Sequence, residues 1–234
     1  MIFSAGLGTR FKPWTDTHPK ALAVVNGKSL LQRNIEYLRQ FGISDVVVNV
    51  HHFPGQIREA LEKNHGWGSN VTVSDETGEL LETGGGLLKA RHLLGGGAFL
   101  TINVDILTDA PLDQMMEAHR REEALITLAV TDRRTSRYLL FNVMNRLCGW
   151  RNVSTGEERI SFPADHYTQK AFSGIAIFDP SIFGLIRFDG RFSLIDVFLD
   201  LAAGHKIVGF DHSGTRFIDV GKPDSVAAAE QLFS

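Results

Sequence analysis

After a short apolar segment, the chain continues as Ser4-Ala-Gly-Leu-Gly-Thr-Arg-Phe-Lys-Pro-Trp-Thr15 and runs on to His18-Pro-Lys-Ala-Leu22. The preceding Met1–Ala5 is typical of a first strand, so the glycines form a turn at its end. Such a turn lets backbone N–H groups approach an anion, because glycine has no Cβ in the way. Two cations, Arg10 and Lys20, flank this cradle of amides. The stretch therefore predicts a polyphosphate-binding loop.

Three familiar sequence signatures do not match. A Walker A loop, Gly-x4-Gly-Lys-Ser/Thr, is absent, and so is the Gly-x-Ser-x-Gly elbow of α/β-hydrolases. A dinucleotide fingerprint would begin at Gly6, but its last glycine is replaced by Phe11. The acidic residue expected after the second strand is also missing, since Val46–Val50 leads into His51-His52. A nicotinamide-dependent dehydrogenase is therefore disfavoured.

Apolar strand-like runs alternate with amphipathic segments up to about Thr131, which predicts an α/β fold: a mostly parallel, mixed sheet with helices on both faces. The expected strands are Met1–Ala5, Val46–Val50, Val71–Ser74, Phe99–Val104 and Ala124–Thr131, and the expected helices are Leu30–Phe41, Gln56–Lys63, Gly86–Leu94 and Pro111–Glu122. After Thr131, a hairpin through Asn145-Arg146 and further strands are expected. We expect one domain over 1–234, in which about 1–131 bind a nucleotide and 132–234 complete the sheet and cover a second ligand.

Composition excludes several classes of protein. The longest apolar stretches, such as Ala124–Val130, fall short of the roughly 18–20 residues that a membrane-spanning helix needs. A net charge of −3 disfavours a nucleic-acid binder, which normally carries a basic face. Cys148 has no partner for a disulfide, and Met1 directly precedes the expected first strand, which leaves no room for a signal peptide. We expect a soluble, cytoplasmic protein that binds neither membrane nor nucleic acid.

Two aspartates end expected strands. Asp105 follows Phe99–Val104 at the carboxyl edge of the sheet, where α/β folds bind ligands, and Asp219 ends Arg216-Phe-Ile-Asp219. Aspartate is disfavoured in strands, although strand-end aspartates are common. Mg²⁺ takes one or two protein carboxylates and completes its shell with phosphates and water. The pattern alone fits both a metal site and ordinary strand ends.

A second glycine-rich segment, Glu82-Thr-Gly-Gly-Gly86, is expected to open the helix at Gly86–Leu94. Three glycines before a helix allow the backbone to approach a flat base edge or a ribose closely. A flexible entry to the helix is the alternative interpretation. Glu82 and Thr83 are candidate specificity residues on the first interpretation.

The Gly6–Arg10 motif, Gly-x-Gly-Thr-Arg, followed by Pro19-Lys20, resembles the opening signature of the sugar-1-phosphate nucleotidyltransferases, or NDP-sugar pyrophosphorylases, with Trp14 where leucine is usual. The resemblance implies a Rossmann-like, GT-A-like nucleotidyltransferase domain that needs Mg²⁺. It implies that Arg10 grips the triphosphate and that Lys20 lies between the α-phosphate and the incoming sugar phosphate.

The same resemblance assigns the remaining site residues. It implies nucleotide binding by Ala5, Gly6, Gly8, Thr9, Glu82, Thr83, Gly84 and Gly85; sugar binding by Asn103, Ser173 and Gly174; and metal binding by Asp105 and Asp219. One departure is Val104, where the family often has glycine before the first metal-binding aspartate.

The implied reaction transfers a nucleotidyl group from an NTP to a sugar 1-phosphate and releases pyrophosphate. Glu-Thr-Gly-Gly-Gly86 looks like the compact uridylyltransferases, so UTP with N-acetylmuramic acid 1-phosphate is the first expectation. GTP with mannose 1-phosphate, or with another hexose or heptose 1-phosphate, is the alternative. A catalytically silent nucleotide-binding regulatory subunit is a further alternative, which loss of Arg10, Lys20 or a metal aspartate would favour; none is lost. A homodimer and a partner sugar kinase are left open.

Overall fold

The computed structural model describes residues 1–233 and consists of two compact units. Unit 1 comprises Met1–Leu94, Ile102–Ala110 and the described part of Thr215–Ser234. Unit 2 comprises Gly95–Thr101 and Pro111–Gly214. The assignment of 1–131 to a nucleotide and 132–234 to a sugar stays a prediction.

Parallel strands form the sheet of unit 1. The short β1 (Ile2–Phe3) lies between β4 (Asp45–Val50) and the end of β6 (Phe99–Asn103), and β5 (Asn70–Asp75) continues the sheet beyond β4. Four valines of β4 are buried, as expected of an inner parallel strand covered on both faces. The predicted strands at the start of the chain and at 46–50, 71–74 and 99–104 are confirmed to within a few residues.

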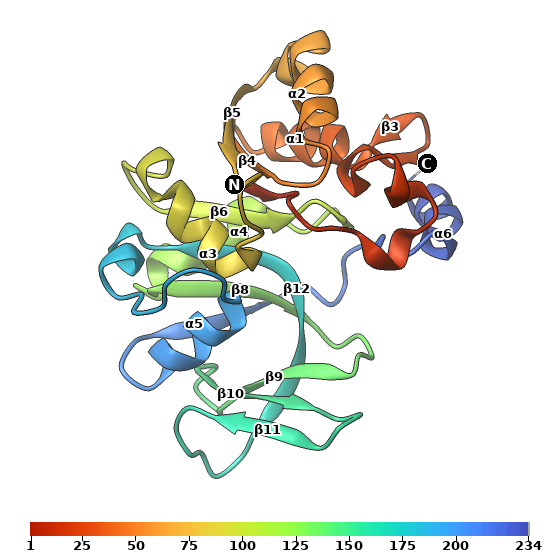
Figure 1. The fold of residues 1–234 in the computed structure, drawn as a ribbon. Coiled ribbons are helices and arrows are strands. Elements are labelled where there is room, and N and C mark those ends of the chain that lie inside the picture. Colours follow the sequence, from red (N-terminus) through yellow and green to blue (C-terminus); the bar gives the residue numbers. More distant parts are fainter. Residues whose placement is uncertain (234) are drawn as a thin grey trace. The chain divides into compact units, whose positions relative to one another are not determined.

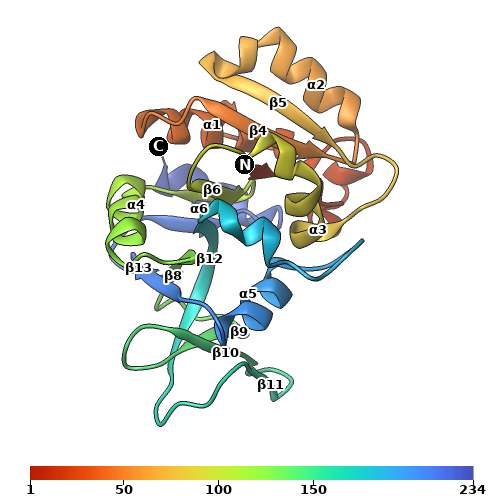
Figure 2. The ribbon, with the colours of Figure 1, turned by 90° about the vertical axis from the view of Figure 1, so that its left-hand side faces the viewer.

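Four α-helices belong to unit 1: α1 (Leu30–Gln40), α2 (Pro54–Lys63), α3 (Glu82–Lys89) and α6 (Asp224–Leu232). Ser29 is the N-cap of α1: its side chain accepts a hydrogen bond from the Gln32 N–H at 3.1 Å and so satisfies a free amide of the first turn. Figures 1 and 2 show α2 alongside β5.

Two short antiparallel pairs complete the strands of unit 1. They are β2 (Val24–Val25) with β3 (Lys28–Ser29), and β7 (Ile106–Thr108) with β14 (Phe217–Asp219). Short 3₁₀ helices lie at Thr9–Phe11, Trp14–Asp16, Lys20–Leu22, His65–Gly68 and Ala90–Leu93.

Unit 2 is mainly antiparallel. Its strand β8 (Ile126–Thr131) pairs with β12 (Thr168–Phe178) in antiparallel and with β13 (Ile207–Asp211) in parallel orientation. The ribbon of β9 (Arg137–Phe141), β10 (Leu147–Asn152) and β11 (Glu157–Ile160) extends from β12 (Figure 1). Its helices are α4 (Leu112–Arg121) and α5 (Leu194–Ala202), with a 3₁₀ helix at Pro180–Gly184.

The predicted α/β class with a mixed sheet is confirmed. The expected helix at Gly86–Leu94 is wrong in its bounds, because α3 begins at Glu82 and ends at Lys89. The glycines Gly84, Gly85 and Gly86 are therefore inside the helix and buried, not in a loop that precedes it. Within residues 1–233, no helix combines the length and the apolar character needed to cross a membrane.

Close packing explains one of these glycines. A Cβ on Gly86 would lie 2.6 Å from Glu76 Oε1 and 3.0 Å from Asn49 Nδ2. Glu76 is fully buried, and its Oε1 accepts a hydrogen bond from Asn49 Nδ2 at 2.7 Å. Neither group can therefore move aside without weakening this hydrogen bond. Gly86 thus lets α3 pack against a buried polar pair.

We predict that Gly86→Ala destabilises the fold by about 1–3 kcal/mol, since overpacking and a weakened Asn49–Glu76 bond outweigh the better helix propensity of alanine. Urea unfolding followed by circular dichroism measures the change. Gly78→Ala is the matched control, because a Cβ there meets nothing within 4 Å. Equal stability of Gly86→Ala and the unaltered protein would contradict this packing argument.

Candidate functional site

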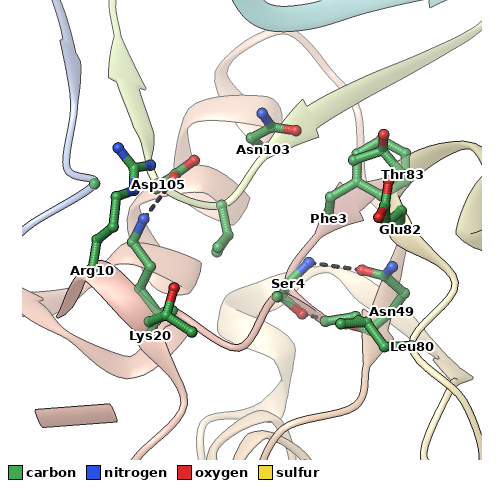
Figure 3. A pocket seen from close by; sticks show the side chains of 16 residues that line it. Phe3, Ser4, Arg10, Lys20, Asn49, Leu80, Glu82, Thr83, Asn103 and Asp105 are labelled. Atoms are coloured by element: carbon green, nitrogen blue, oxygen red, sulfur yellow. Dashed lines mark hydrogen bonds and ion pairs between the residues drawn. The ribbon is translucent and has the colours of Figure 1, made fainter. Parts of the chain in front are cut away.

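A cavity of about 400 Å³ opens at the carboxyl end of the parallel strands of unit 1, a size that suits a small-molecule ligand. All its lining residues belong to unit 1. They come from the end of β1, from the loop after it and from the ends of other strands and nearby loops. Beyond β1 and its loop, they are Lys20, Asn49, Leu80, Glu82, Thr83, Asn103, Val104, Asp105 and Gly221. The site thus lies at the sheet edge predicted from the sequence (Figure 3).

The glycine-rich loop forms one wall of the cavity. Ala5, Gly6, Gly8 and Thr9 all line it, as does Arg10. Gly8 adopts the left-handed conformation, with φ of 61°, and a Cβ there would lie 2.8 Å from Thr15 Cγ2. The hydroxyl of Thr15 donates to the Gly8 carbonyl at 2.9 Å and so fixes the turn. Glycine at position 8 is therefore required by backbone conformation and by space.

One end of the cavity carries opposite charges in contact. Lys20 Nζ lies 2.5 Å from Asp105 Oδ2, and the two side chains are only 11% and 21% exposed. Figure 3 shows Arg10 beside this pair, while Glu82 and Thr83 lie at the other end of the cavity. Partial burial strengthens such a pair relative to one in water. The predicted Arg10, Lys20 and Asp105 are thus brought together.

The second predicted aspartate, Asp219, does not line the cavity, but strand pairing brings it next to the segment that carries Asp105. Asp219 lies opposite Ile106 in the β7–β14 ladder, and the Val220 N–H donates to the Asp105 carbonyl at 2.8 Å. A Cβ on Gly221 would lie 2.8 Å from Asp219 Oδ1 and 3.1 Å from Arg10 Nη2. The side chains of Asp219 and Arg10 therefore approach each other over Gly221, which itself lines the cavity.

These carboxylates fit a hard divalent cation. Within the described part of the chain, no group of three or more His, Cys, Asp or Glu side chains has a metal-binding arrangement. Mg²⁺ does not need one, because it is held by one or two carboxylates together with substrate phosphates and water. Asp105 and Asp219 lie on neighbouring backbone segments, and their carboxylates are the oxygen donors that such a site would need.

The opposite end of the cavity is built by a hydrogen-bonded network that the sequence analysis missed. Asn49 Oδ1 accepts from the Ser4 N–H at 2.7 Å, and the Ser4 hydroxyl donates to the Asn49 carbonyl. Ser4 and Asn49 both line the cavity. The available signal was a single amide residue within Val46–Val50, an otherwise apolar buried strand.

Glu76 extends this network, because its carboxylate accepts a hydrogen bond from Asn49. Burial raises the pKa of its carboxyl group above the usual value, although the hydrogen bond from Asn49 and the positive charge of Lys89 offset part of this effect. Both polar atoms of the Asn49 amide are thereby engaged, Oδ1 by Ser4 and Nδ2 by Glu76. The Asn49 side chain is held in one orientation at the cavity wall.

The other predicted contacts divide into two groups. Asn103, Glu82 and Thr83 line the cavity, whereas Gly84 and Gly85 are buried in α3 and are not part of its lining. Ser173 and Gly174 lie on β12 of unit 2. Ser173 is fully buried and its hydroxyl lies 2.8 Å from His212 Nε2, while Gly174 has a φ of 73°. Their sugar-binding role stays a prediction.

Sequence comparisons give the family. The profile of the family described as Nucleotidyl transferase matches residues 1–233. The N-acetylmuramate alpha-1-phosphate uridylyltransferase of Caulobacter vibrioides is 30% identical over 98% of this chain and 94% of its own length. The enzyme of the same name from Neisseria meningitidis is 43% identical over 47% of both chains, and the mannose-1-phosphate guanyltransferase of Yarrowia lipolytica is 30% identical over 100% of this chain. The matches span 47% and 63% of these last two relatives' own lengths.

Solved structures share the fold. HddC from Yersinia pseudotuberculosis, complexed with GMP-PN, covers 100% of this chain and 98% of its own with a TM-score of 0.79 and 22% identity. A putative glucose-1-phosphate thymidylyltransferase from Bacillus anthracis covers 99% of this chain and 93% of its own, with a TM-score of 0.80 and 16% identity. By its profile match and by its relatives, the chain belongs to the Nucleotidyl transferase family, a family of transferase-class enzymes.

Proposed function

We propose that the protein joins an NTP to a sugar 1-phosphate and releases an NDP-sugar and pyrophosphate. The observation that carries the proposal is the meeting of Arg10, Lys20 and Asp105 beside the glycine-rich loop in one cavity. Two anionic substrates repel each other, and cations fixed beside a row of backbone amides offset that repulsion. The family relationship supports the same reaction class.

The reaction needs positioning and electrostatics more than proton transfer. An oxygen of the sugar phosphate attacks the α-phosphorus, and the bond between this phosphorus and the oxygen bridging to the β-phosphate breaks. The attacking oxygen is already anionic at pH 7, so no general base is required. The enzyme's task is to hold the two phosphates in line and to stabilise the charge on the α-phosphate and the departing pyrophosphate.

In the proposed roles, amides of Gly6–Thr9 orient the triphosphate, Arg10 binds it, and Lys20 lies between the α-phosphate and the sugar phosphate. Mg²⁺ held by Asp105 and Asp219 supplies further positive charge to the phosphates. Lys20 pairs with Asp105 at 2.5 Å, so the ammonium and the metal-binding carboxylate occupy the same end of the cavity. Glu82 and Thr83 line the opposite end of the cavity, and we assign them the contact with the base.

We propose UTP and N-acetylmuramic acid 1-phosphate as the substrates. The support is the Caulobacter vibrioides uridylyltransferase, matched over 94% of its own length, together with the Neisseria meningitidis uridylyltransferase at 43% identity. GTP with mannose 1-phosphate is the second candidate, since guanyltransferases match all of this chain at 25–30% identity.

We predict that Lys20→Ala and Asp105→Asn each lower kcat at least about 100-fold, or about 2.7 kcal/mol, with the fold intact, because each removes charge that acts on the reacting phosphates. Mg²⁺-dependent pyrophosphate release measures the effect. Lys28→Ala is the matched control, because it removes another lysine paired with a carboxylate, Glu36, at 2.6 Å. Near-normal turnover in the purified Lys20 or Asp105 variant would exclude these roles.

Pyrophosphate release from UTP, GTP, CTP and dTTP, each crossed with the 1-phosphates of N-acetylmuramic acid, N-acetylglucosamine, mannose, glucose and a heptose, tests the substrates. We expect the highest kcat/KM for UTP with N-acetylmuramic acid 1-phosphate. Preference for GTP with mannose 1-phosphate would establish the second candidate. Nucleotide binding without turnover in every pair would contradict the proposed activity and favour a regulatory subunit.

A further inference from the structure

Asn34 is a polar residue on the apolar face of α1. Its neighbours on that face, Leu30, Leu31, Ile35 and Leu38, are at most 1% exposed, and Asn34 itself is 1% exposed. A buried amide is costly unless its polar atoms form hydrogen bonds. The contacts of this side chain therefore indicate why an amide is present.

The amide nitrogen of Asn34 donates to carbonyl groups on two segments of the chain. Its Nδ2 lies 3.0 Å from the Leu30 oxygen of its own helix, 2.9 Å from the Val104 oxygen and 3.2 Å from the Ile106 oxygen. Two N–H groups are thus shared among three acceptors. The reversed orientation of the amide is excluded, because it would place an oxygen against these three carbonyl oxygens.

The oxygen of the Asn34 amide forms no hydrogen bond within the described residues. This Oδ1 atom is also buried. A leucine of similar size would fill the same space without an unsatisfied oxygen. Packing alone does not require an amide at this position, so its N–H donors are the reason that an asparagine is present.

The two long-range acceptors flank Asp105. Val104 and Asp105 form the turn between β6 and β7, so neither belongs to a strand. The Val104 N–H donates to the Phe3 carbonyl at 3.0 Å, and the Asp105 carbonyl accepts from Val220. Asn34 donates to the carbonyls of Val104 and Ile106, the residues before and after Asp105. Hydrogen bonds from β1, from α1 and from the segment after β14 therefore fix the backbone around Asp105.

We infer that Asn34 is a positioning residue for the Asp105 carboxylate. By holding both flanking peptides, it fixes the direction in which Asp105 enters the cavity and thus its approach to a divalent cation and to Lys20. The inference rests on the proposed function, in which Asp105 is a metal ligand. Groups that orient metal ligands typically change metal affinity or activity 10–100-fold when removed.

The test uses Asn34→Leu, which keeps the size of the side chain and removes its donors, and Asn34→Asp as a second variant of the same shape. Thr127→Val is the matched control, because it removes another buried hydrogen bond between a helix and a strand, the one between His119 Nδ1 and Thr127 Oγ1 at 2.9 Å in unit 2. Thermal unfolding curves identify a temperature at which the unaltered protein and all variants are folded. At that temperature, two constants are measured: the Mg²⁺ concentration for half-maximal pyrophosphate release, and the Kd for Mn²⁺ with UTP present, by electron paramagnetic resonance.

We expect the folded Asn34 variants to raise both metal constants about tenfold or more, while Thr127→Val lowers the unfolding temperature and leaves both within twofold. Metal constants within twofold of those of the unaltered protein in a folded Asn34 variant would overturn the inference. Absence of pyrophosphate release from the unaltered protein would reject the proposed function alone, because the Mn²⁺ arm still measures Asn34. Unchanged Mn²⁺ binding in Asp105→Asn would overturn both the metal assignment and the inference.

Discussion

The antiparallel pairing of β7 with β14 is the constraint on which the site depends. These strands are only three residues long, yet their register places Asp219 opposite Ile106 and the Val220 N–H on the Asp105 carbonyl. Asp219, from a distant part of the sequence, is thereby brought next to the backbone of Asp105, which lines the cavity. A shift of the register by one residue would turn Asp219 to the other side of the ladder.

Charge balance follows from this pairing. Carboxylates in a partly buried cavity repel each other, and Lys20 and Arg10 supply the compensating charges. The same groups suit a triphosphate and a cation together, because phosphates neutralise the basic side chains while a metal ion neutralises the aspartates. Opposite charges from separate segments thus lie close together, since Lys20 contacts Asp105 and the side chains of Arg10 and Asp219 both lie close to Gly221.

Sequence reasoning predicted the parts of this site that local rules determine. A glycine turn after a strand and an aspartate at a strand end are visible in a few letters, and the structure places Gly8, Arg10, Lys20 and Asp105 at one cavity. The start of α3 at Glu82 was missed, because runs of glycine favour loops unless tertiary packing, here against Glu76, rewards their small size. The roles of Asn34 and Asn49 were missed because their partners are far away in the sequence.

In the proposed site, Asp105 and Asp219 hold a divalent cation beside the glycine-rich loop. A crystal structure with Mn²⁺ and UTP, with data collected at the manganese absorption edge, tests it most directly. We expect an anomalous peak within coordination distance, about 2.0–2.2 Å, of an oxygen of each carboxylate and of a phosphate oxygen. A manganese ion bound elsewhere, with Asp105 still paired to Lys20, would contradict it.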